Sequence, residues 1–481
     1  MTLGPATPAP APAESPAVPL KRHVYIETMG CQMNVYDSDR MFDALTRHGY
    51  VQTENVELAD LVLLNTCSIR DKVEHKMMSM LGSLRKLKAH NPDLVLGITG
   101  CVAQQEGERL LKRVPGLDLV LGPDQIGRLP ELVAAIRAEQ HRTSAIEFVH
   151  RRNYVFPEAL PPQDGRVAAM VTVMKGCNKV CSFCIVPFTR GREVSKPSAD
   201  VVAEVEMLVR HGVREVMLLG QNVNSYGKDR AGELDFAGLL RAVDAIDGLH
   251  RIRFMTSHPM DCTDALIDAF GDLKKLCPFF HLPIQSGSES VLTGMRRAHG
   301  VTDYLEHIDR LRARVPGIAL STDIIVGFPG ETEEDFTRTI ELLERVRYAS
   351  IYSFIYSPRP GTRAADLTDD VPDEIKKERL ARVQALQDRI TADTLASFQG
   401  QVTEVLFEGP ARVNQAAPNT RLGGVRLEGP PQMSGRNPQN LKVNVPTTDA
   451  AAFAEWPGRL GRVEIERVKA HSLLGKLIGW V

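Results

Sequence analysis

The sequence from Met174 to Pro187 reads Met-Lys-Gly-Cys-Asn-Lys-Val-Cys-Ser-Phe-Cys-Ile-Val-Pro. It places Cys177, Cys181 and Cys184 in a C-x3-C-x2-C array, and three thiolates on one tight loop are typical of a metal site. Structural zinc is usually held by four protein ligands, and no fourth Cys or His follows Cys184 at a short spacing. An iron-sulfur cluster with one open iron therefore fits better than a zinc knuckle or incidental thiols.

Length and composition limit the class of protein that carries this loop. A chain of 481 residues should hold about three domains. Lys plus Arg (58) nearly balances Asp plus Glu (60), so net charge does not indicate a nucleic-acid partner. The chain has eight cysteines and neither a signal-like segment nor a run of about 18 apolar residues. We therefore expect a cytoplasmic protein whose thiols bind metal or do redox chemistry, with no membrane association.

The N-terminal part alternates strand-like and helical patterns, which predicts a parallel sheet. The candidate strands are 23–28, 61–65, 94–98 and 118–122, and the first helix is expected over 37–48. Cys31, Cys67 and Cys101 each follow one of the first three strands. The carboxyl ends of parallel strands share one edge, where open α/β sheets bind ligands. A buried structural cysteine would instead be expected inside a strand or on a helix face, so these three predict a second iron-sulfur cluster.

A Pro-rich linker over 151–165 precedes six further strand-helix units. The candidate strands are 168–174, 215–219, 252–255, 279–282, 318–326 and 350–355, and the helical patterns are 199–210, 236–246, 263–270, 304–315 and 332–346. Six units indicate an incomplete barrel, a partial (β/α)6 arrangement rather than eight units. The cysteine loop follows the first of these strands, and barrel active sites lie at the carboxyl ends of strands. The two observations agree.

A long charged helix over 373–398 closes this domain, and the pattern then becomes all-β. Short apolar runs at 403–407, 424–427, 441–445 and 462–468 lie between Gly, Pro and Asn turns, which predicts a small barrel. From Gln401 onward there are ten Lys or Arg and seven Asp or Glu, which is only mildly basic. Composition alone leaves both an RNA-binding role and a solubility cap open.

The cysteine array, with Phe183 just before its last cysteine, resembles the signature of radical S-adenosylmethionine (SAM) enzymes. The resemblance implies a 4Fe-4S cluster whose fourth iron chelates SAM, so that reductive cleavage releases a 5′-deoxyadenosyl radical. Such a radical attacks carbon that no general base can deprotonate. Turns that follow the second, fourth and fifth barrel strands are expected to supply further SAM contacts. The candidate SAM-binding residues are Phe183, Gln221, Asn222, Gln285, Ser286, Gly327 and Glu331.

From His23 onward the chain resembles the radical-SAM methylthiotransferase family, in its tRNA-modifying branch. The motifs are Gly-Cys-Gln-Met-Asn-Val-Tyr-Asp-Ser at 30–38, Asn-Thr-Cys-Ser-Ile-Arg at 65–70, Gly-Cys at 100–101, the cysteine loop with Pro187 and Arg190-Gly191, Gly-Gln-Asn-Val-Asn-Ser-Tyr at 220–226, and Ser-Thr-Asp-Ile-Ile-Val-Gly-Phe-Pro-Gly-Glu at 321–331. In addition, Gly-Arg-Asn-Pro-Gln-Asn at 435–440 resembles a turn of the RNA-binding TRAM domain. Residues 1–21 are rich in Ala and Pro with few charges, which predicts a disordered tail. The resemblance implies a methylthiotransferase domain over 22–150, a radical-SAM barrel over 166–398 and a TRAM domain over 399–481.

The resemblance also implies a role for each cysteine. Cys177, Cys181 and Cys184 would hold the SAM-binding 4Fe-4S cluster, and a second, auxiliary 4Fe-4S cluster would be held by Cys31, Cys67 and Cys101. Cys262 and Cys277 match no ligand motif. One SAM would methylate sulfur at the auxiliary cluster, and a second would generate the radical that takes hydrogen from C2 of an adenine.

The implied substrate is the isopentenylated adenosine immediately 3′ of the anticodon in tRNA, whose anticodon loop would be splayed for access. An external electron donor such as a flavodoxin or ferredoxin is implied, and we expect a monomer. Three alternatives stay open from the residues: methylthiolation of threonylcarbamoyladenosine, methylthiolation of a ribosomal-protein aspartate, and a non-catalytic RNA-binding protein with structural or redox-sensing clusters. The Met33-Asn34 pair and the Asn222-Val-Asn224 turn favour the tRNA substrate.

Overall fold

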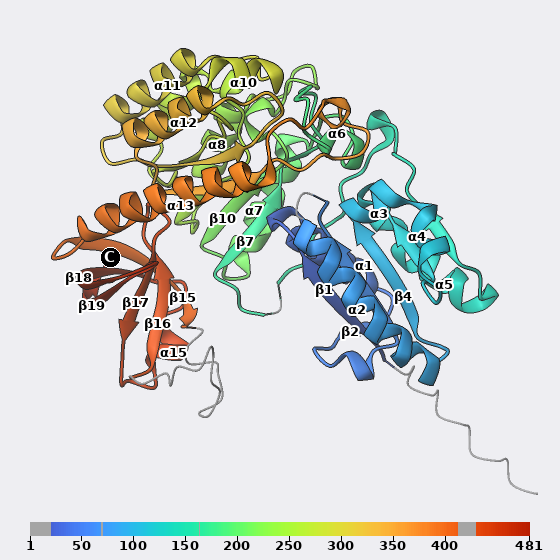
Figure 1. Cartoon of the computed structure of the whole chain (residues 1–481). Helices are drawn as coiled ribbons and strands as arrows, with labels where there is room; N and C mark the ends of the chain where they lie inside the picture. The colour runs from blue at the N-terminus through green and yellow to red at the C-terminus, as the bar shows by residue number, and fades with distance from the viewer. Residues whose placement is uncertain (1–20, 69–70, 163, 412–429) are drawn as a thin grey trace, which may run out of the picture.

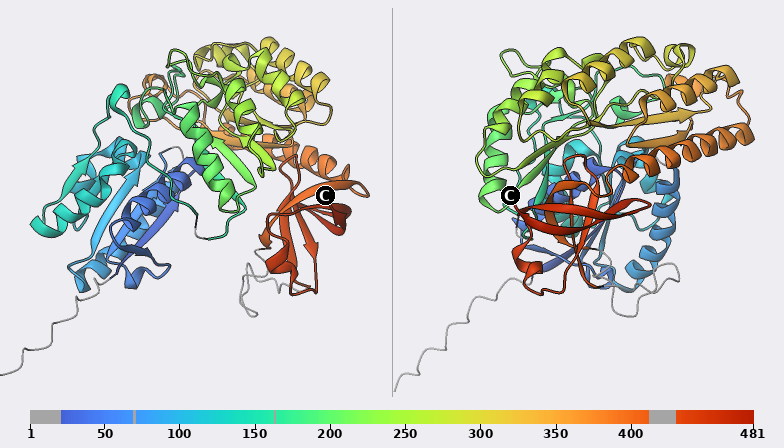
Figure 2. Two further views of the ribbon diagram at one scale, coloured as in Figure 1. Left: turned by 180° about the vertical axis from the view of Figure 1, so that it is seen from behind. Right: turned by 90° about the vertical axis from the view of Figure 1, so that its left-hand side faces the viewer.

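The computed structural model describes residues 21–68, 71–162, 164–411 and 430–481. A central half-open barrel forms the top of an arch, and an N-terminal sheet domain and a C-terminal barrel lie below it on opposite sides (Figures 1 and 2). The tail expected over 1–21 lies outside the described residues except for Lys21. No helix within the described part of the chain is both long and apolar enough to span a bilayer.

The N-terminal domain is a parallel six-stranded sheet in the order β2-β1-β3-β4-β5-β6, as its strand-helix alternation predicts. Its strands are β1 (Arg22–Met29), β2 (Tyr50–Gln52), β3 (Leu61–Thr66), β4 (Val95–Gly100), β5 (Leu119–Leu121) and β6 (Thr143–Ala145). Its helices are α1 (Gln32–Thr46), α2 (Asp71–His90), α3 (Cys101–Glu106), α4 (Glu108–Arg113) and α5 (Leu129–Glu139). Every residue of β3 and β4 is buried, as expected for strands covered on both faces. Helix α1 begins five residues earlier than predicted, directly after Cys31.

Six parallel strands in two three-stranded sheets, β11-β10-β7 and β12-β13-β14, form the central barrel. An isolated parallel bridge between Ile252 and Leu276 links the two sheets, so the predicted partial barrel is confirmed. The strands are β7 (Ala168–Thr172), β10 (Glu215–Leu219), β11 (Arg251–Phe254), β12 (Phe279–His281), β13 (Ala319–Val326) and β14 (Ser350–Ile355). The helices are α6 (Val186–Thr189), α7 (Ser198–Arg210), α8 (Phe236–Asp244), α9 (Asp264–Asp272), α10 (Glu289–Gly294), α11 (Val301–Arg314), α12 (Glu333–Val346) and α13 (Asp373–Ala396). A short antiparallel pair, β8 (Met174–Lys175) and β9 (Val194–Ser195), flanks the cysteine loop.

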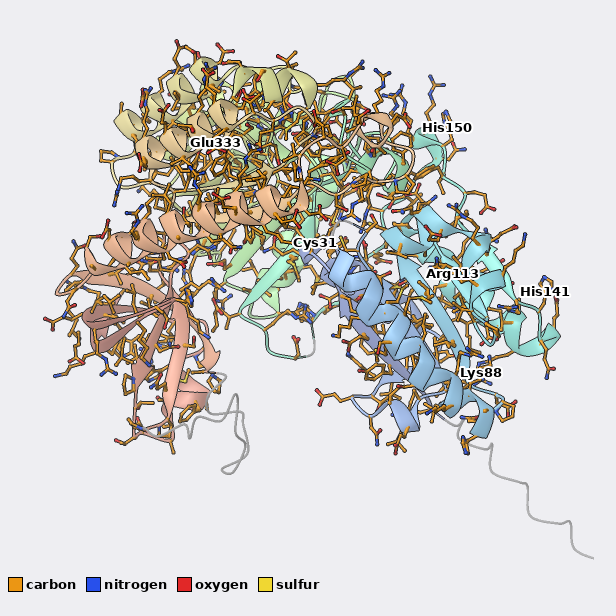
Figure 3. All side chains as sticks on the ribbon, in the orientation of Figure 1. Cys31, Lys88, Arg113, His141, His150 and Glu333 are labelled. Carbon is orange, nitrogen blue, oxygen red and sulfur yellow. The ribbon has the colours of Figure 1, made fainter. Side chains whose placement is uncertain are left out.

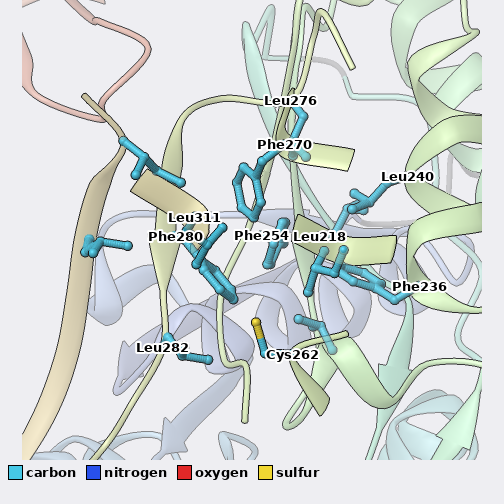
Figure 4. Close-up of a cluster of buried hydrophobic side chains, with 14 of the residues drawn as sticks. Leu218, Phe236, Leu240, Phe254, Cys262, Phe270, Leu276, Phe280, Leu282 and Leu311 are labelled. Carbon is cyan, nitrogen blue, oxygen red and sulfur yellow. The ribbon is translucent and has the colours of Figure 1, made fainter. Parts of the chain in front are cut away.

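The main core lies between the barrel strands and their helices. Val216 and Leu218 of β10 face this core, and Phe254 of β11 stacks edge to face on Phe236 of α8 with ring centroids 4.9 Å apart. Figure 4 shows Cys262 among these apolar side chains. Burial raises its pKa to about 12, so Cys262 behaves as a small core residue.

The inner face of the barrel receives helix α1 of the N-terminal domain. Alternate strand residues point inward, and Leu219, Met255 and Phe279 pack there against Met33 and Tyr36 of α1. All five side chains are buried. Because Cys31 immediately precedes α1, this packing places Cys31 at the junction of the two domains (Figure 3).

The C-terminal domain is a closed five-stranded barrel in the order β15-β16-β17-β19-β18, as predicted. Its elements are β15 (Val402–Pro410), β16 (Gln432–Arg436), β17 (Lys442–Pro446), α15 (Ala452–Glu455), β18 (Leu460–Lys469) and β19 (Ser472–Trp480). The sequence patterns missed β16 and β19. The run predicted at 424–427 lies outside the described residues.

Two arginines of β11 fasten the C-terminal barrel to the amino end of the central barrel. Arg253 is 1% exposed and donates hydrogen bonds to the carbonyls of Asn437 and Pro438, both at 2.8 Å, and to Glu215 Oε1 at 3.0 Å. Arg251 donates to Glu404 Oε1 at 2.9 Å. The turn over 435–440 therefore contacts the central barrel through its backbone.

Replacement of Arg253 by Ala should destabilise the C-terminal barrel. It would leave the buried Glu215 carboxylate, the buried Asn437 carbonyl and the half-buried Pro438 carbonyl without their donor, which costs about 3 kcal/mol. The two tryptophans, Trp456 and Trp480, both lie in this barrel, so tryptophan fluorescence during urea unfolding reports on it selectively.

Arg462→Ala is the matched control because Arg462 is exposed on β18, and we expect its effect to stay within about 0.5 kcal/mol. An Arg253→Ala protein that unfolds at the wild-type urea concentration would contradict the anchoring role.

Candidate active site

The cysteine loop leaves the central barrel after β7 and is held by a glycine that no other residue could replace. Gly176 has φ +75°, and a Cβ at this position would lie 2.0 Å from the carbonyl oxygen of Arg192. The loop then closes with a hydrogen bond from the Cys184 amide to the Cys181 carbonyl at 3.2 Å. Cys177, Cys181 and Cys184 all line one cavity of about 270 Å³ at the carboxyl ends of the strands.

Four of the predicted SAM-binding residues line the same cavity: Phe183, Gln221, Asn222 and Gln285. Gln221 Oε1 also accepts a hydrogen bond from the amide of Gly176, which ties the turn after β10 to the cysteine loop. Gln285 has φ +82°, an uncommon backbone conformation for a residue with a side chain. Its amide and carbonyl pair with Asp323 and Ile325 of β13.

The other three predicted residues have protein partners outside this lining. Ser286 Oγ lies 3.3 Å from Thr339 Oγ1. Glu331 accepts from the Gly327 amide at 2.6 Å and from Arg379 Nη1 at 2.8 Å. The loop over 325–331 is thus joined to α13 through a buried ion pair.

Several buried polar atoms of the cavity wall find no hydrogen-bond partner among the described residues. They are Asn222 Oδ1, Ser257 Oγ, Tyr356 OH and Arg297 Nε. Buried polar groups are rarely left unpaired, because each costs about 1–3 kcal/mol. A polar ligand with both donors and acceptors would satisfy them, and SAM has this character.

The orientation of the Asn222 side chain follows from its neighbours. Its Nδ2 donates to Asp261 Oδ2 at 2.8 Å and to Glu193 Oε1 at 3.3 Å. Carboxylates only accept, so the amide cannot flip, and Oδ1 is left as the free acceptor. Asp261 is held in turn by Lys179 at 2.8 Å and Lys228 at 2.6 Å, which together with Asn222 keep its pKa low despite burial.

The second cysteine trio lies where the first three N-terminal loops meet. Cys31 precedes α1, Cys67 follows β3 and Cys101 begins α3 after β4. A buried pair, Asn34 and Asn65, joins two of these loops: Asn65 Nδ2 donates to the Asn34 carbonyl at 2.7 Å, and Asn34 Nδ2 donates to Asn65 Oδ1 at 3.1 Å. This pair holds together the segments that carry Cys31 and Cys67, at the sheet edge where the sequence pattern predicts the trio.

The thiols of the two trios differ in their environments. A hydrogen bond with Cys67 lowers the pKa of Cys31 to about 6, with a further contribution from Arg190. Burial raises the pKa of Cys101, and it raises those of Cys177 and Cys184 to about 12. Bound iron would reverse this, since a coordinating thiol is deprotonated outright.

Each trio supplies three cysteine thiols, a donor set that iron-sulfur clusters use. All eight cysteines are free thiols. No three His, Cys, Asp or Glu side chains within the described ranges converge on one ion. In a 4Fe-4S cluster each cysteine binds a different iron, so wider spacing of the sulfurs is expected.

Sequence reasoning missed two arginines that contact cysteine sulfurs. Arg297 Nη1 lies 3.6 Å from Cys181 Sγ, and Arg190 Nε lies 3.3 Å from Cys101 Sγ. Arg190 belongs to the Arg190-Gly191 motif, so its position was evident from the sequence. Its partner across the domain junction was not.

The cavity wall also holds His281. Burial lowers the pKa of His281 to about 4, so its imidazole is neutral.

Known families match two parts of the chain. The model of the uncharacterized protein family UPF0004 matches residues 23–122, and that of the radical SAM superfamily matches residues 171–343. These segments carry the two cysteine trios.

Solved structures share the fold. The radical S-adenosylmethionine methyltransferase TsrM from Kitasatospora setae, with tryptophan and a SAM analogue bound, is similar with a TM-score of 0.55. At 16% identity, over 72% of this chain and 75% of that chain, this likeness concerns the fold alone.

Full-length relatives are much more similar in sequence. The tRNA-2-methylthio-N(6)-dimethylallyladenosine synthase of Anaeromyxobacter sp. (strain K) is 50% identical over 98% of both chains. The synthase of the same name from Geobacter metallireducens is 50% identical over 94% of this chain and 98% of its own. That of Myxococcus xanthus is 48% identical over 95% and 94%. At this identity and coverage, the chain belongs to the family of tRNA-2-methylthio-N(6)-dimethylallyladenosine synthases.

Proposed function

We propose that the protein is a radical SAM enzyme that transfers a methylthio group to C2 of N6-isopentenyl (dimethylallyl) adenosine immediately 3′ of the anticodon in tRNA. The observation that carries this proposal is the 50% identity to synthases named for this product, over nearly the whole chain. The site supports it, because Arg190, six residues beyond Cys184, contacts Cys101 of the other trio across the domain junction. One cysteine trio alone would not account for the transfer of sulfur to the adenosine.

Two 4Fe-4S clusters fit the proposed reaction. When bound, the cluster at Cys177, Cys181 and Cys184 supplies the electron that cleaves SAM, and the auxiliary cluster at Cys31, Cys67 and Cys101 supplies sulfur. SAM is consumed twice per turnover, as methyl donor and as the source of the 5′-deoxyadenosyl radical. An external donor such as a flavodoxin or ferredoxin provides the electron.

The side chains around the cavity bind and orient SAM. Asn222 Oδ1 accepts a hydrogen bond from it, and Phe183, Gln221 and Gln285 complete the wall. Ser286, Gly327 and Glu331 support the strand ends that carry this wall, through contacts with α12 and α13.

Each of the three domains has its own role in the proposed reaction. We assign residues 22–150 to the methylthiotransferase domain, 151–165 to a linker, 166–398 to the radical-SAM barrel and 399–481 to a TRAM domain that binds the tRNA. Since the backbone of the turn over 435–440 contacts the central barrel, other faces of the C-terminal barrel contact RNA. The enzyme works as a cytoplasmic monomer on the anticodon loop.

Deletion of the gene should remove 2-methylthio-N6-isopentenyladenosine from bulk tRNA and leave N6-isopentenyladenosine in its place. Mass spectrometry of tRNA nucleosides measures both, and expression of the wild-type chain should restore the product. Persistence of the methylthio nucleoside would contradict the assignment. Loss of methylthiolated threonylcarbamoyladenosine, or of a methylthio group on a ribosomal-protein aspartate, would reassign the substrate, and no change in any of these would favour a non-catalytic role.

Single cysteine changes should separate the roles of the two trios. Cys181→Ala should abolish SAM cleavage, because it removes a ligand of the SAM-binding cluster. Cys67→Ala should leave abortive cleavage to 5′-deoxyadenosine but no sulfur insertion. Chromatography of 5′-deoxyadenosine and iron analysis provide the readouts, with about eight irons in the wild type and about four in each variant. Cys262→Ala is the control and should keep about eight irons, and equal loss of both activities in Cys67→Ala would count against separate roles.

Asn222→Ala should weaken SAM binding about tenfold, since one hydrogen bond to a buried polar group is worth about 1–1.5 kcal/mol. Equilibrium dialysis with the reconstituted protein measures the dissociation constant. Asn55→Ala, at an exposed 3-10 helix cap of the N-terminal domain, serves as a control. Unchanged affinity in Asn222→Ala would exclude this contact.

A further inference from the structure

Arg190 connects the central barrel to the auxiliary trio. It lies six residues beyond Cys184, after α6, and is 5% exposed. Its Nε donates a hydrogen bond to Cys101 Sγ at 3.3 Å, and its Nη2 lies 2.6 Å from Asp37 Oδ2 of α1. Both partners belong to the N-terminal domain, so the guanidinium crosses the domain junction.

The charged residues around Arg190 leave its guanidinium free to donate a hydrogen bond to a thiolate. A buried guanidinium needs counter-charge, and Asp37 supplies one. Asp37 is itself buried, and desolvation raises its pKa while Arg190 lowers it. The neighbouring cation, Lys175, already has its own carboxylate in Asp124. The sulfur of Cys101 is therefore the second acceptor that faces Arg190.

A comparable arginine lies at the other trio. Arg297 Nη1 contacts Cys181 Sγ at 3.6 Å, while its Nη2 donates to the Pro283 carbonyl. Arg297 and Cys181 are both in the central barrel, so this contact does not depend on how the domains are placed. Arg190 differs because its contact with sulfur exists only when the N-terminal domain is docked.

We propose that Arg190 is a positioning residue that stabilises the reduced form of the auxiliary cluster and makes its reduction potential depend on domain docking. This inference rests on the proposed two-cluster function. Hydrogen bonds to the sulfurs and nearby net charge set the potentials of iron-sulfur clusters, and a cation at a ligating thiolate favours the state with one more electron. One electron enters the cluster from the external donor, and no bond of Arg190 is made or broken.

The test uses the full-length chain with Cys177, Cys181 and Cys184 all changed to Ala, so that the remaining iron belongs to the auxiliary trio. Dithionite titration followed by electron paramagnetic resonance gives its midpoint potential. Arg190→Gln should lower the equilibrium constant for reduction about tenfold, which is about 59 mV for a one-electron couple. Arg190→Lys keeps the charge and should give a smaller fall.

Arg166→Gln is the matched control. Arg166 pairs with Asp39 of the same helix α1 at 2.7 Å and also crosses the domain junction, but it contacts the carboxylates of Asp39 and Asp164 and not a cysteine sulfur. If Arg190 acts through the thiolate, Arg166→Gln should leave the potential unchanged. Arg190→Gln could instead lose its iron while Arg190→Lys and Arg166→Gln retain theirs. This result would also support the requirement for a positive charge beside the Cys101 sulfur.

Two outcomes would overturn the inference. One is an Arg190→Gln protein that keeps its iron and titrates at the parent potential. The other is an equal shift of the midpoint potential, or an equal loss of iron, in Arg190→Gln and Arg166→Gln. It would indicate that the two arginines act only by holding the domains together. A parent chain that holds no iron before any arginine is changed is a different result, because it would remove the second cluster and with it the proposed function.

Discussion

The packing of helix α1 against the central barrel is the contact on which the rest of the molecule depends. Met33 and Tyr36 of α1 form one buried apolar cluster with Leu219, Met255 and Phe279 of the barrel. Each such side chain contributes roughly 1.5–3 kcal/mol when fully buried. Because Cys31 immediately precedes α1, hydrophobic packing sets the position of the auxiliary trio relative to the cavity.

Buried arginines then fix how the outer domains are placed against the central barrel. Apolar contacts tolerate sliding, whereas a buried guanidinium is stable only where its acceptors are in place. Arg190 finds Asp37 and Cys101 in the N-terminal domain, and Arg253 finds the backbone of Asn437 and Pro438 in the C-terminal barrel. Both outer domains are thus held by cations of the central barrel, which accounts for the arch seen in Figure 1.

Much of the fold follows from local patterns. The apolar run over 61–64 is continuous because both faces of the strand are covered, and it predicts β3 closely. Short or glycine-interrupted strands do not stand out in this way: β2 has three residues, and β16 contains Gly435 and polar side chains. Helix α1 begins before its predicted start because Met33 and Tyr36 face another domain, so its apolar positions do not follow the pattern of a helix on its own sheet.

The sequence by itself determined the chemistry and the edges where it occurs. Three cysteines in one loop and three after successive strands predict two metal-binding trios, since parallel strands must end on one side. Only the tertiary structure decided which side chains meet. Phe183, Gln221, Asn222 and Gln285 share a cavity, whereas Ser286 contacts α12, Glu331 contacts α13 and Gly327 donates to Glu331. The contact of Arg190 with Cys101 spans 89 positions of the chain, and long-range pairing of this kind is set by packing between domains, which no local pattern encodes.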